Sequence, residues 1–165
     1  GERFLEVVAG LDVGYRDENC FVVIGFDGLK YYIIDEYISR ESTTSELAEI
    51  VKEKLDFWNI DNIYIDSAAQ QTKADFAYDF DIYCENAIKS VNDGIASLQA
   101  LIEQDRLLFD TEGAMHCFSA MSSYKWNPNT ETPKPVHDWA SHPCDAIRYA
   151  IYSHQKMSSV SVFTH

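Results

Sequence analysis

The chain has 165 residues, of which 46% are hydrophobic and 13% aromatic, so it can fill a core of its own and is not a disordered chain. This length favours a single domain. The charge is lopsided, with 27 acidic residues against 13 basic ones and a formal net charge of −14. That balance excludes a nucleic-acid binder that works through bulk positive charge, but it is compatible with an enzyme that holds cations with carboxylates.

The sequence shows no pattern typical of a membrane span or a signal peptide. No apolar run reaches the roughly 18 residues of a membrane-spanning helix. The first residues lack the basic-then-apolar order of a signal peptide and pass almost at once into a strand-like stretch. We therefore expect a domain excised from a longer chain.

The first third of the chain has the patterns of a β-sheet. They predict three strands, over residues 4–11, 20–26 and 29–37. The second and third strands are joined by Asp27-Gly28, a strong hairpin signal. The first strand runs directly into Asp12.

A helix and a fourth strand follow. Thr43-Thr44-Ser45-Glu46 has the pattern of a capping box and is followed by apolar residues at helical spacing up to Trp58. The fourth strand, over residues 62–65, ends on Asp66. The order of elements therefore begins β-β-β-α-β.

The second half alternates short strands with helices. Strands are expected over 82–84 and 106–109, and helices over 72–80, 112–122 and about 143–154. A further helix, capped by Ser90-Val91-Asn92-Asp93, carries Val91, Ile95, Leu98 and Ile102 on one predicted apolar face. Residues 123–137 hold three of the four prolines and predict a loop or irregular hairpin, and residues 157–165 a frayed tail.

The four cysteines are widely spaced and form no CxxC pair. Each lies among apolar neighbours, which favours buried thiols over a disulfide or a zinc site. They are Cys20, Cys84, Cys117 and Cys144.

Four acidic or imidazole side chains fall at the ends of predicted elements. Asp12 and Asp66 close two strands, and His142 and Asp145 share a face at the start of the last helix. If the two strands are parallel neighbours, their aspartates lie side by side and raise each other's pKa unless a cation sits between them. Oxygen ligands of this kind suit Mg²⁺ or Mn²⁺ better than zinc.

Each of these residues also has an ordinary structural explanation. An aspartate at a strand end can cap the following turn. Asp145 can be stabilised by the positive end of the helix dipole, and His142 can be an N-cap. The joint pattern of two strand-end aspartates and a helix aspartate is what favours a metal site.

Four short motifs contain these residues or lie between them. They are Gly10-Leu11-Asp12-Val13-Gly14-Tyr15 with Asp17 following, Ile65-Asp66-Ser67-Ala68, Ser90-Val91-Asn92-Asp93-Gly94-Ile95, and His142-Pro143-Cys144-Asp145-Ala146-Ile147-Arg148-Tyr149. In this order they resemble the nuclease domain of the large terminase subunit of tailed double-stranded DNA bacteriophages, a ribonuclease H-like family. The resemblance spans roughly residues 5–154. It implies an α/β fold with a central mixed sheet flanked by helices on both faces.

The resemblance also implies a chemistry. Asp12, Asp66 and Asp145 would hold two Mg²⁺ or Mn²⁺ ions for phosphodiester cleavage, with His142 as a further ligand or a proton-transfer group. Asp138, one turn upstream, would orient His142 or a metal-bound water. Asp17 is more typical of a turn than of a ligand.

DNA contacts must come from a few lysines, given the acidic balance. Lys125 and Lys134 lie in the proline-containing segment, Lys73 follows the Asp66 turn, and Lys89 precedes a helix N-terminus that favours phosphate. Trp126 lies in the same segment as Lys125.

The sequence departs from the family at two points. Ala69 and Gln70 stand where relatives often carry an acidic residue and a proline, and the stretch 85–90 is short where relatives often carry a basic, glycine-rich loop. The chain also contains no GxxxxGK[ST] phosphate loop, so the ATPase motor of a complete large subunit is not in it.

By resemblance, the partners are double-stranded DNA, an N-terminal ATPase domain of the full-length chain, the small terminase subunit and the portal protein. The place of action is the cytoplasm of the infected host, where concatemeric viral DNA is cut during packaging. Two alternatives remain open at this point. They are a junction resolvase of the same fold, which needs a dimer, and a non-catalytic interaction domain with a degenerate metal site.

Overall fold

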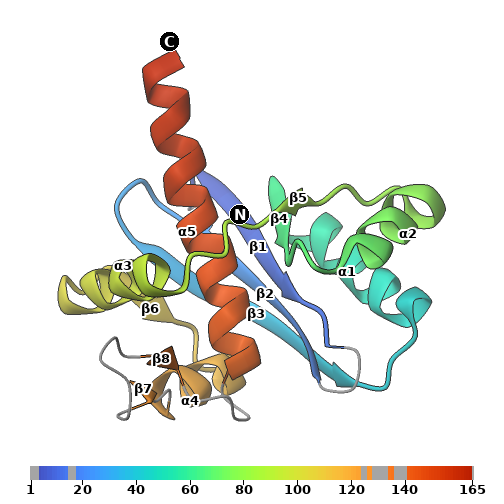
Figure 1. Cartoon of the computed structure of the whole chain (residues 1–165), viewed down its shortest axis with the longest axis horizontal. Coiled ribbons are helices and arrows are strands. Elements are labelled where there is room, and N and C mark those ends of the chain that lie inside the picture. Colours follow the sequence, from blue (N-terminus) through green and yellow to red (C-terminus); the bar gives the residue numbers. More distant parts are fainter. Residues whose placement is uncertain (1–3, 15–17, 124–125, 128–133, 136–140, 165) are drawn as a thin grey trace.

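The computed structural model describes residues 4–14, 18–123, 126–127, 134–135 and 141–164 of the chain. Six strands form one sheet in the order β5-β4-β1-β2-β3-β6, and two short strands form a separate antiparallel pair (Figure 1). The strands of the main sheet are β1 (Glu6–Asp12), β2 (Glu18–Phe26), β3 (Tyr31–Arg40), β4 (Asn62–Ile65), β5 (Glu85–Asn86) and β6 (Leu107–Phe109). The small pair is β7 (Trp126–Asn127) and β8 (Lys134–Pro135).

Five helices complete the described part of the fold. They are α1 (Thr44–Trp58), α2 (Gln70–Phe80), α3 (Val91–Glu103), α4 (Met115–Ser123) and α5 (Ser141–Thr164). None of these helices, within the described residues, is both long and apolar enough to cross a membrane.

The sheet is mixed. Strands β1, β2 and β3 form an antiparallel meander, whose Asp27-Gly28 turn is closed by the Asp27 carboxylate accepting the backbone N–H groups of Leu29 and Lys30. Gly28 has a φ of 102°, which favours glycine. Strand β4 then adds to β1 in parallel, β5 to β4 in parallel, and β6 to β3 in parallel.

Helices cover both faces of the sheet, as the predicted architecture requires. One face packs against α3, α4 and α5, and the other against α1 and α2 (Figure 1). Alternation along β1 divides its side chains between these two cores, since Val8 lies in the first and Ala9 and Leu11 lie in the second.

Gly10 lets α5 approach β1 closely. A Cβ atom at this position would lie 2.0 Å from the carbonyl oxygen of Ala146 and 3.2 Å from the Cβ of Ala150. The helix backbone therefore rests directly on the central strand, and the start of α5 is fixed at the edge where β1 ends.

Helix α1 begins as the sequence predicts. The hydroxyl of Thr43 accepts the N–H of Glu46, and the Glu46 carboxylate accepts the N–H of Thr43, which is a complete capping box. Leu47, Ala48 and Val51 form its buried face.

Several expected elements differ from the structure. The strand expected over 82–84 is wrong, because the N–H of Ile82 closes the end of α2 on the carbonyl of Phe76 and the strand starts only at Glu85. The apolar face of α3 consists of Ile95, Leu98 and Leu101 with Gly94. Val91 and Ile102, expected on this face, are 39% and 45% exposed.

The last helix is longer than expected. Helix α5 begins at Ser141, two residues before Pro143, and continues to Thr164. It therefore runs through the stretch where we expect a frayed tail, well past the expected helix end at His154.

The cysteine expectation is confirmed. All four cysteines lie in the described part of the chain and are buried thiols.

Candidate functional site

The two strand-end aspartates lie on neighbouring parallel strands. Leu11 of β1 pairs with Ile65 of β4, so Asp12 and Asp66 follow at adjacent positions of the same sheet edge. The N–H of Asp66 donates to the carbonyl of Leu11 at 3.3 Å, which extends the ladder to the last residue. The expected juxtaposition of Asp12 and Asp66 is therefore present.

Helix α5 adds an imidazole to this edge. Nδ1 of His142 lies 2.6 Å from Oδ2 of Asp12, and both side chains are largely buried, at 15% and 7% exposure. His142 and Asp12 are 130 positions apart in sequence, so the contact depends on the packing of α5 against β1. The structure thus joins the first and last motifs of the chain.

Asp145, one turn further along α5, lies in the electrostatic range of the same carboxylates. Burial raises the pKa of Asp145, and the charge of Asp12 raises it further, while Arg148 and His142 act in the opposite direction. Burial also raises the pKa of Tyr149. The negative charges of Asp12, Asp145 and Asp66 raise this pKa further, in decreasing order of effect. All three aspartates therefore act on one buried phenol, which places them in one neighbourhood.

Two basic side chains of this chain engage the carboxylates. Nζ of Lys89 lies 2.6 Å from Oδ1 of Asp66, and Nη2 of Arg148 lies 3.0 Å from Oδ1 of Asp145. Arg148 also donates through Nη1 to the carbonyl oxygens of Lys89, at 3.0 Å, and Ser90, at 3.2 Å. One guanidinium thus ties the helix aspartate to the segment that carries the lysine.

The donor set fits a hard divalent cation. Its atoms are carboxylate oxygens with one imidazole, which Mg²⁺ and Mn²⁺ accept, and no thiolate is among them. Within the described residues, no three acidic, histidine or cysteine side chains converge closely enough to hold an ion as they stand. Asp66 and Asp145 instead point their oxygens at Lys89 and Arg148. A metal ion that binds Oδ1 of Asp66 would have to displace the ammonium of Lys89.

The remaining predicted residues are placed as follows. Nζ of Lys73 donates to the side-chain oxygen of Asn86 at 3.0 Å, beside the short strand β5. Lys134 lies in β8, with no side-chain placement described. Asp17, Lys125 and Asp138 lie outside the described residues.

Sequence reasoning missed the roles of Lys89 and Arg148 in this arrangement. It treated Lys89 only as a DNA contact and Arg148 only as part of a motif. Arg148 follows Asp145 by three positions, the spacing of an ion pair on a helix, so this contact had a signal in the sequence. The contact between Lys89 and Asp66 had none, because it depends on how the segment before α3 crosses the end of β4.

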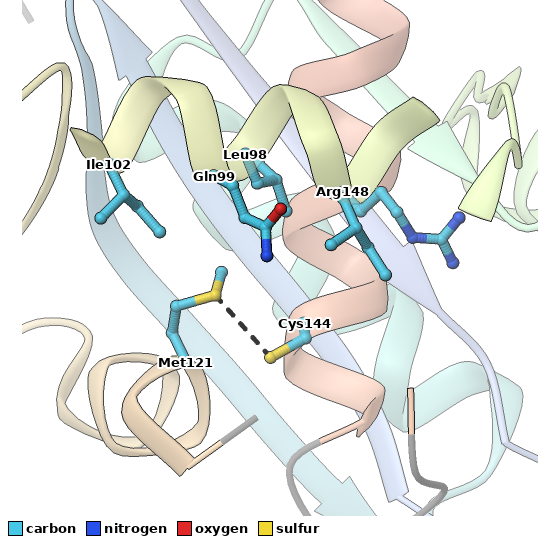
Figure 2. Close-up of a pocket in the computed structure, with 7 residues that line it drawn as sticks. Leu98, Gln99, Ile102, Met121, Cys144 and Arg148 are labelled. Carbon is cyan, nitrogen blue, oxygen red and sulfur yellow. Dashed lines mark hydrogen bonds between the residues drawn. The ribbon is translucent and has the colours of Figure 1, made fainter. Parts of the chain in front are cut away.

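A separate pocket of about 170 Å³ lies between α3, α4 and α5 (Figure 2). No carboxylate lines it, and the thiol of Cys144 faces the sulfur of Met121 across it at 4.0 Å. The lining residues are Ile95, Leu98, Gln99, Ile102, Met121, Cys144 and Arg148. This pocket is therefore distinct from the aspartate cluster, although Arg148 borders both.

Comparison with known proteins identifies the family of this chain. Residues 9–154 match the family model described as the terminase RNaseH-like domain. The chain belongs to this family. A curated relative, the large terminase subunit of Escherichia phage T5, is 39% identical over 159 residues, which cover 92% of this chain and 36% of the relative.

Solved terminase structures share the fold. The nuclease domain of the large terminase of bacteriophage SPP1, solved with bound Mn, has a TM-score of 0.77 at 23% identity and covers 92% of this chain and 88% of that one. A large terminase of a thermophilic bacteriophage, solved with ATP-gamma-S, has a TM-score of 0.78 at 21% identity and covers 88% of this chain and 39% of that one. The present terminase domain thus spans little more than a third of a large subunit, and its fold is ribonuclease H-like, as expected.

Proposed function

We propose that this terminase domain is a divalent-metal-dependent endonuclease that cuts double-stranded concatemeric viral DNA during genome packaging. The observation that carries the proposal is that Asp12 and Asp66 end two neighbouring parallel strands, with His142 of α5 in contact with Asp12 and Asp145 one turn further along that helix. The Mn ion bound to the related SPP1 nuclease domain supports the same choice of metal.

Asp12, Asp66, Asp145 and His142 would hold the ions. Two divalent ions would supply an activated water and stabilise the leaving oxygen of the cleaved phosphodiester. His142, held at 2.6 Å from Asp12, has a fixed ring orientation, which suits either a ligand or a proton-transfer group. Asp12 is buried and the side chain of Asp145 is 24% exposed, so water has limited access to this part of the site.

Substrate recognition would depend on phosphate rather than on base sequence. Lys73 and Lys89 lie at the edge of the site, and Lys125 and Lys134 are the further lysines that we propose to contact the DNA backbone. Contacts to phosphate carry little base information, so cleavage should be largely independent of sequence. We extend the proposal to an ATPase domain in the full-length chain, to the small subunit and portal as partners, and to the cytoplasm of the infected host.

Plasmid cleavage tests this function directly. The purified chain should nick or cut supercoiled plasmid with Mn²⁺ or Mg²⁺, and not with Ca²⁺ alone or with excess chelator. Asp66→Asn should abolish cleavage, because it removes a ligand charge, whereas Asp79→Asn, on an exposed position of α2, should leave it unchanged. Cleavage that persists in excess chelator would exclude the metal mechanism.

The two alternatives give different results in the same assay. A junction resolvase would be a stable dimer and would prefer four-way junctions over linear duplex. A non-catalytic interaction domain would bind no Mn²⁺ in a titration and would cut no DNA.

A further inference from the structure

We propose that Lys89 is a resident cation that neutralises Asp66 in the metal-free domain, and that it transfers to a DNA phosphate once a divalent ion occupies Asp66. This inference rests on the proposed nuclease function. It adds a residue that affects first the binding of the metal ion and then the binding of the DNA phosphate. It goes beyond a plain DNA contact, because it predicts opposite effects of Lys89 on metal binding and on DNA binding.

The geometry of the pair is the first observation. Nζ of Lys89 is 2.6 Å from Oδ1 of Asp66, the distance of a charge-assisted hydrogen bond. The same oxygen also accepts the N–H of Ala68 at 2.9 Å. A cation and a backbone donor therefore already engage Oδ1, and Asp66 cannot give this oxygen to a metal ion while the ammonium stays in place.

The backbone around Lys89 is fixed on both sides. The N–H of Ala87 donates to the carbonyl of Ile65 at 2.8 Å, and the N–H of Ile88 donates to the hydroxyl of Ser153 at 2.9 Å. The carbonyl oxygens of Lys89 and Ser90 both accept from Arg148. Release of Asp66 must therefore occur by rotation of the lysine side chain, without movement of the chain that carries it.

The two basic residues of the site differ in how readily they can leave their carboxylates. The side chain of Arg148 is 6% exposed and is held by Asp145 and by two carbonyl groups. Its stem packs against Gly94, where a Cβ would lie 2.8 Å from Cγ and Cδ. The side chain of Lys89 is 40% exposed and its ammonium has one carboxylate partner in the described structure. Lys89 is therefore the exchangeable cation, and Arg148 is a permanent one.

After its release from Asp66, the ammonium stays close to the proposed metal ligands, because it can move no further than the length of the lysine side chain. A phosphodiester bound for cleavage brings its negative charge to that same place, which makes the phosphate the natural new partner of Lys89. One positive charge would thus serve the site in both states, first against a carboxylate and then against the substrate.

Metal affinity in the absence of DNA provides the main test. We would titrate the metal-free chain with Mn²⁺ by calorimetry, and compare wild type with Lys89→Gln, Lys89→Arg and Lys73→Gln. Lys89→Gln removes the competing ammonium and should tighten Mn²⁺ binding about two- to fivefold, the scale of a half-exposed ion pair. Lys89→Arg keeps the charge and should stay near wild type.

Lys73→Gln is the matched control. It removes the same charge beside the site, but Lys73 contacts Asn86 and no site carboxylate. Its Mn²⁺ affinity should stay within about twofold of wild type, because a charge without direct contact is weakened by solvent. Circular dichroism and thermal unfolding of each variant would show that the folds are equivalent.

Duplex binding in Ca²⁺ across a salt series tests the second half of the inference. Loss of one phosphate contact should lower the slope of log K against log salt by about 1 for Lys89→Gln, together with weaker binding. The same variant would therefore bind metal more tightly and DNA less tightly than wild type.

The outcomes separate this inference from the proposed function. If wild type binds Mn²⁺ and Lys89→Gln binds it no more tightly, or if Lys73→Gln tightens binding equally, the exchange is wrong and the nuclease proposal stands. If wild type binds no Mn²⁺ and cuts no DNA, both fail together.

Discussion

Asp145 is a carboxylate whose environment is unfavourable to its charge. Burial raises its pKa above the ordinary value, the neighbouring Asp12 adds to this effect, and Arg148 only partly offsets it. A group of this kind is destabilising when it is ionised in the metal-free protein. It becomes favourable only when further positive charge arrives.

The sign of this effect gives a pH-dependent prediction. Because the folded-state pKa of Asp145 is raised, its contribution to stability is full below the unfolded-state pKa and is lost as pH rises through the folded-state pKa. Asp145→Asn removes this loss while keeping a hydrogen-bond acceptor for Arg148. In chelator, the variant should therefore gain stability over wild type as pH rises from acidic values to neutrality.

Thermal unfolding at a series of pH values measures this difference. Asp79→Asn, an exposed change of the same formal charge on α2, should show no comparable trend. A difference between Asp145→Asn and wild type that is constant with pH would contradict the assignment of the effect to ionisation of Asp145.

At the level of single residues, the sequence was sufficient to predict where the three aspartates lie and insufficient for their partners. Asp12, Asp66 and Asp145 could be predicted because they stand at the ends of recognisable elements. The contact of Lys89 with Asp66 could not, since it depends on a crossing of two segments that no local pattern encodes. Long-range contacts of this kind follow from tertiary packing alone.

Among the elements, α5 has the closest contact with the sheet. Its backbone rests on β1 at Gly10, and its first turn supplies His142 to Asp12. The interface between α5 and β1 therefore determines both the stability of the fold and the geometry of the site.

Gly10→Ala should disrupt this interface strongly. The added methyl group would lie 2.0 Å from the carbonyl oxygen of Ala146, and backbone of a packed helix cannot move away without shifting α5. We expect a loss of at least about 3 kcal/mol in the free energy of unfolding, measured with urea.

Gly94→Ala is the informative comparison for Gly10→Ala. Its added methyl group would lie 2.8 Å from Cγ and Cδ of the Arg148 side chain instead of backbone, and alanine favours the helix. It should cost about 1–2 kcal/mol, less than Gly10→Ala, because a side-chain stem can shift further than the backbone of a packed helix. Equal losses for the two variants would show that close approach to the α5 backbone is not the cause.

A hydrogen-bonded chain with a buried histidine at its centre holds α5 further along its length. The hydroxyl of Tyr31 lies 2.6 Å from Nδ1 of His154, and Nε2 of His154 lies 2.6 Å from Oε2 of Glu6. This chain joins α5 to β3 and β1 and satisfies both nitrogens of a histidine that is 2% exposed.

Tyr31→Phe should therefore destabilise the domain. It leaves Nδ1 of His154 without its partner in a buried position, which costs about 1–3 kcal/mol in the free energy of unfolding. Tyr78→Phe removes the same hydroxyl from a side chain that is 92% exposed and should cost nothing measurable in the same urea titration.

Most elements could be predicted from local patterns, and the exceptions have local physical causes. The capping box of α1 and the Asp27-Gly28 turn act within a few residues, so the sequence shows them directly. The strand expected over 82–84 failed because the left-handed Asp81 and the N–H of Ile82 are used to close α2. Helix α5 exceeded its expected length because its serine-rich end has weak, not prohibitive, helix propensity.

Over the whole molecule, the net charge of −14 opposes contact with a polyanion. Such repulsion reaches about 10 Å at 0.1 M salt, and only a few lysines, together with the proposed metal ions, would offset it locally. A small positive footprint releases few counterions on binding DNA.

The isolated domain should therefore bind duplex weakly in Ca²⁺, with a shallow dependence on salt. Fluorescence anisotropy across a salt series measures both quantities. Neutralising Lys125 and Lys134 together should slow cleavage while leaving Mn²⁺ affinity unchanged. Tight binding with a steep salt slope would reveal a basic groove that the composition does not predict.

The burial of every cysteine makes the native chain suitable for site-specific labelling. Burial raises the pKa of Cys84 to about 12, and the pKa of Cys20 is raised well above its usual range, chiefly by its hydrogen bond with Cys117 and by burial. Alkylating dyes require an accessible thiolate, so the folded protein should resist maleimides until denaturant exposes its thiols. A single introduced cysteine, as in Tyr78→Cys, would then carry the only fluorophore, with no native cysteine removed.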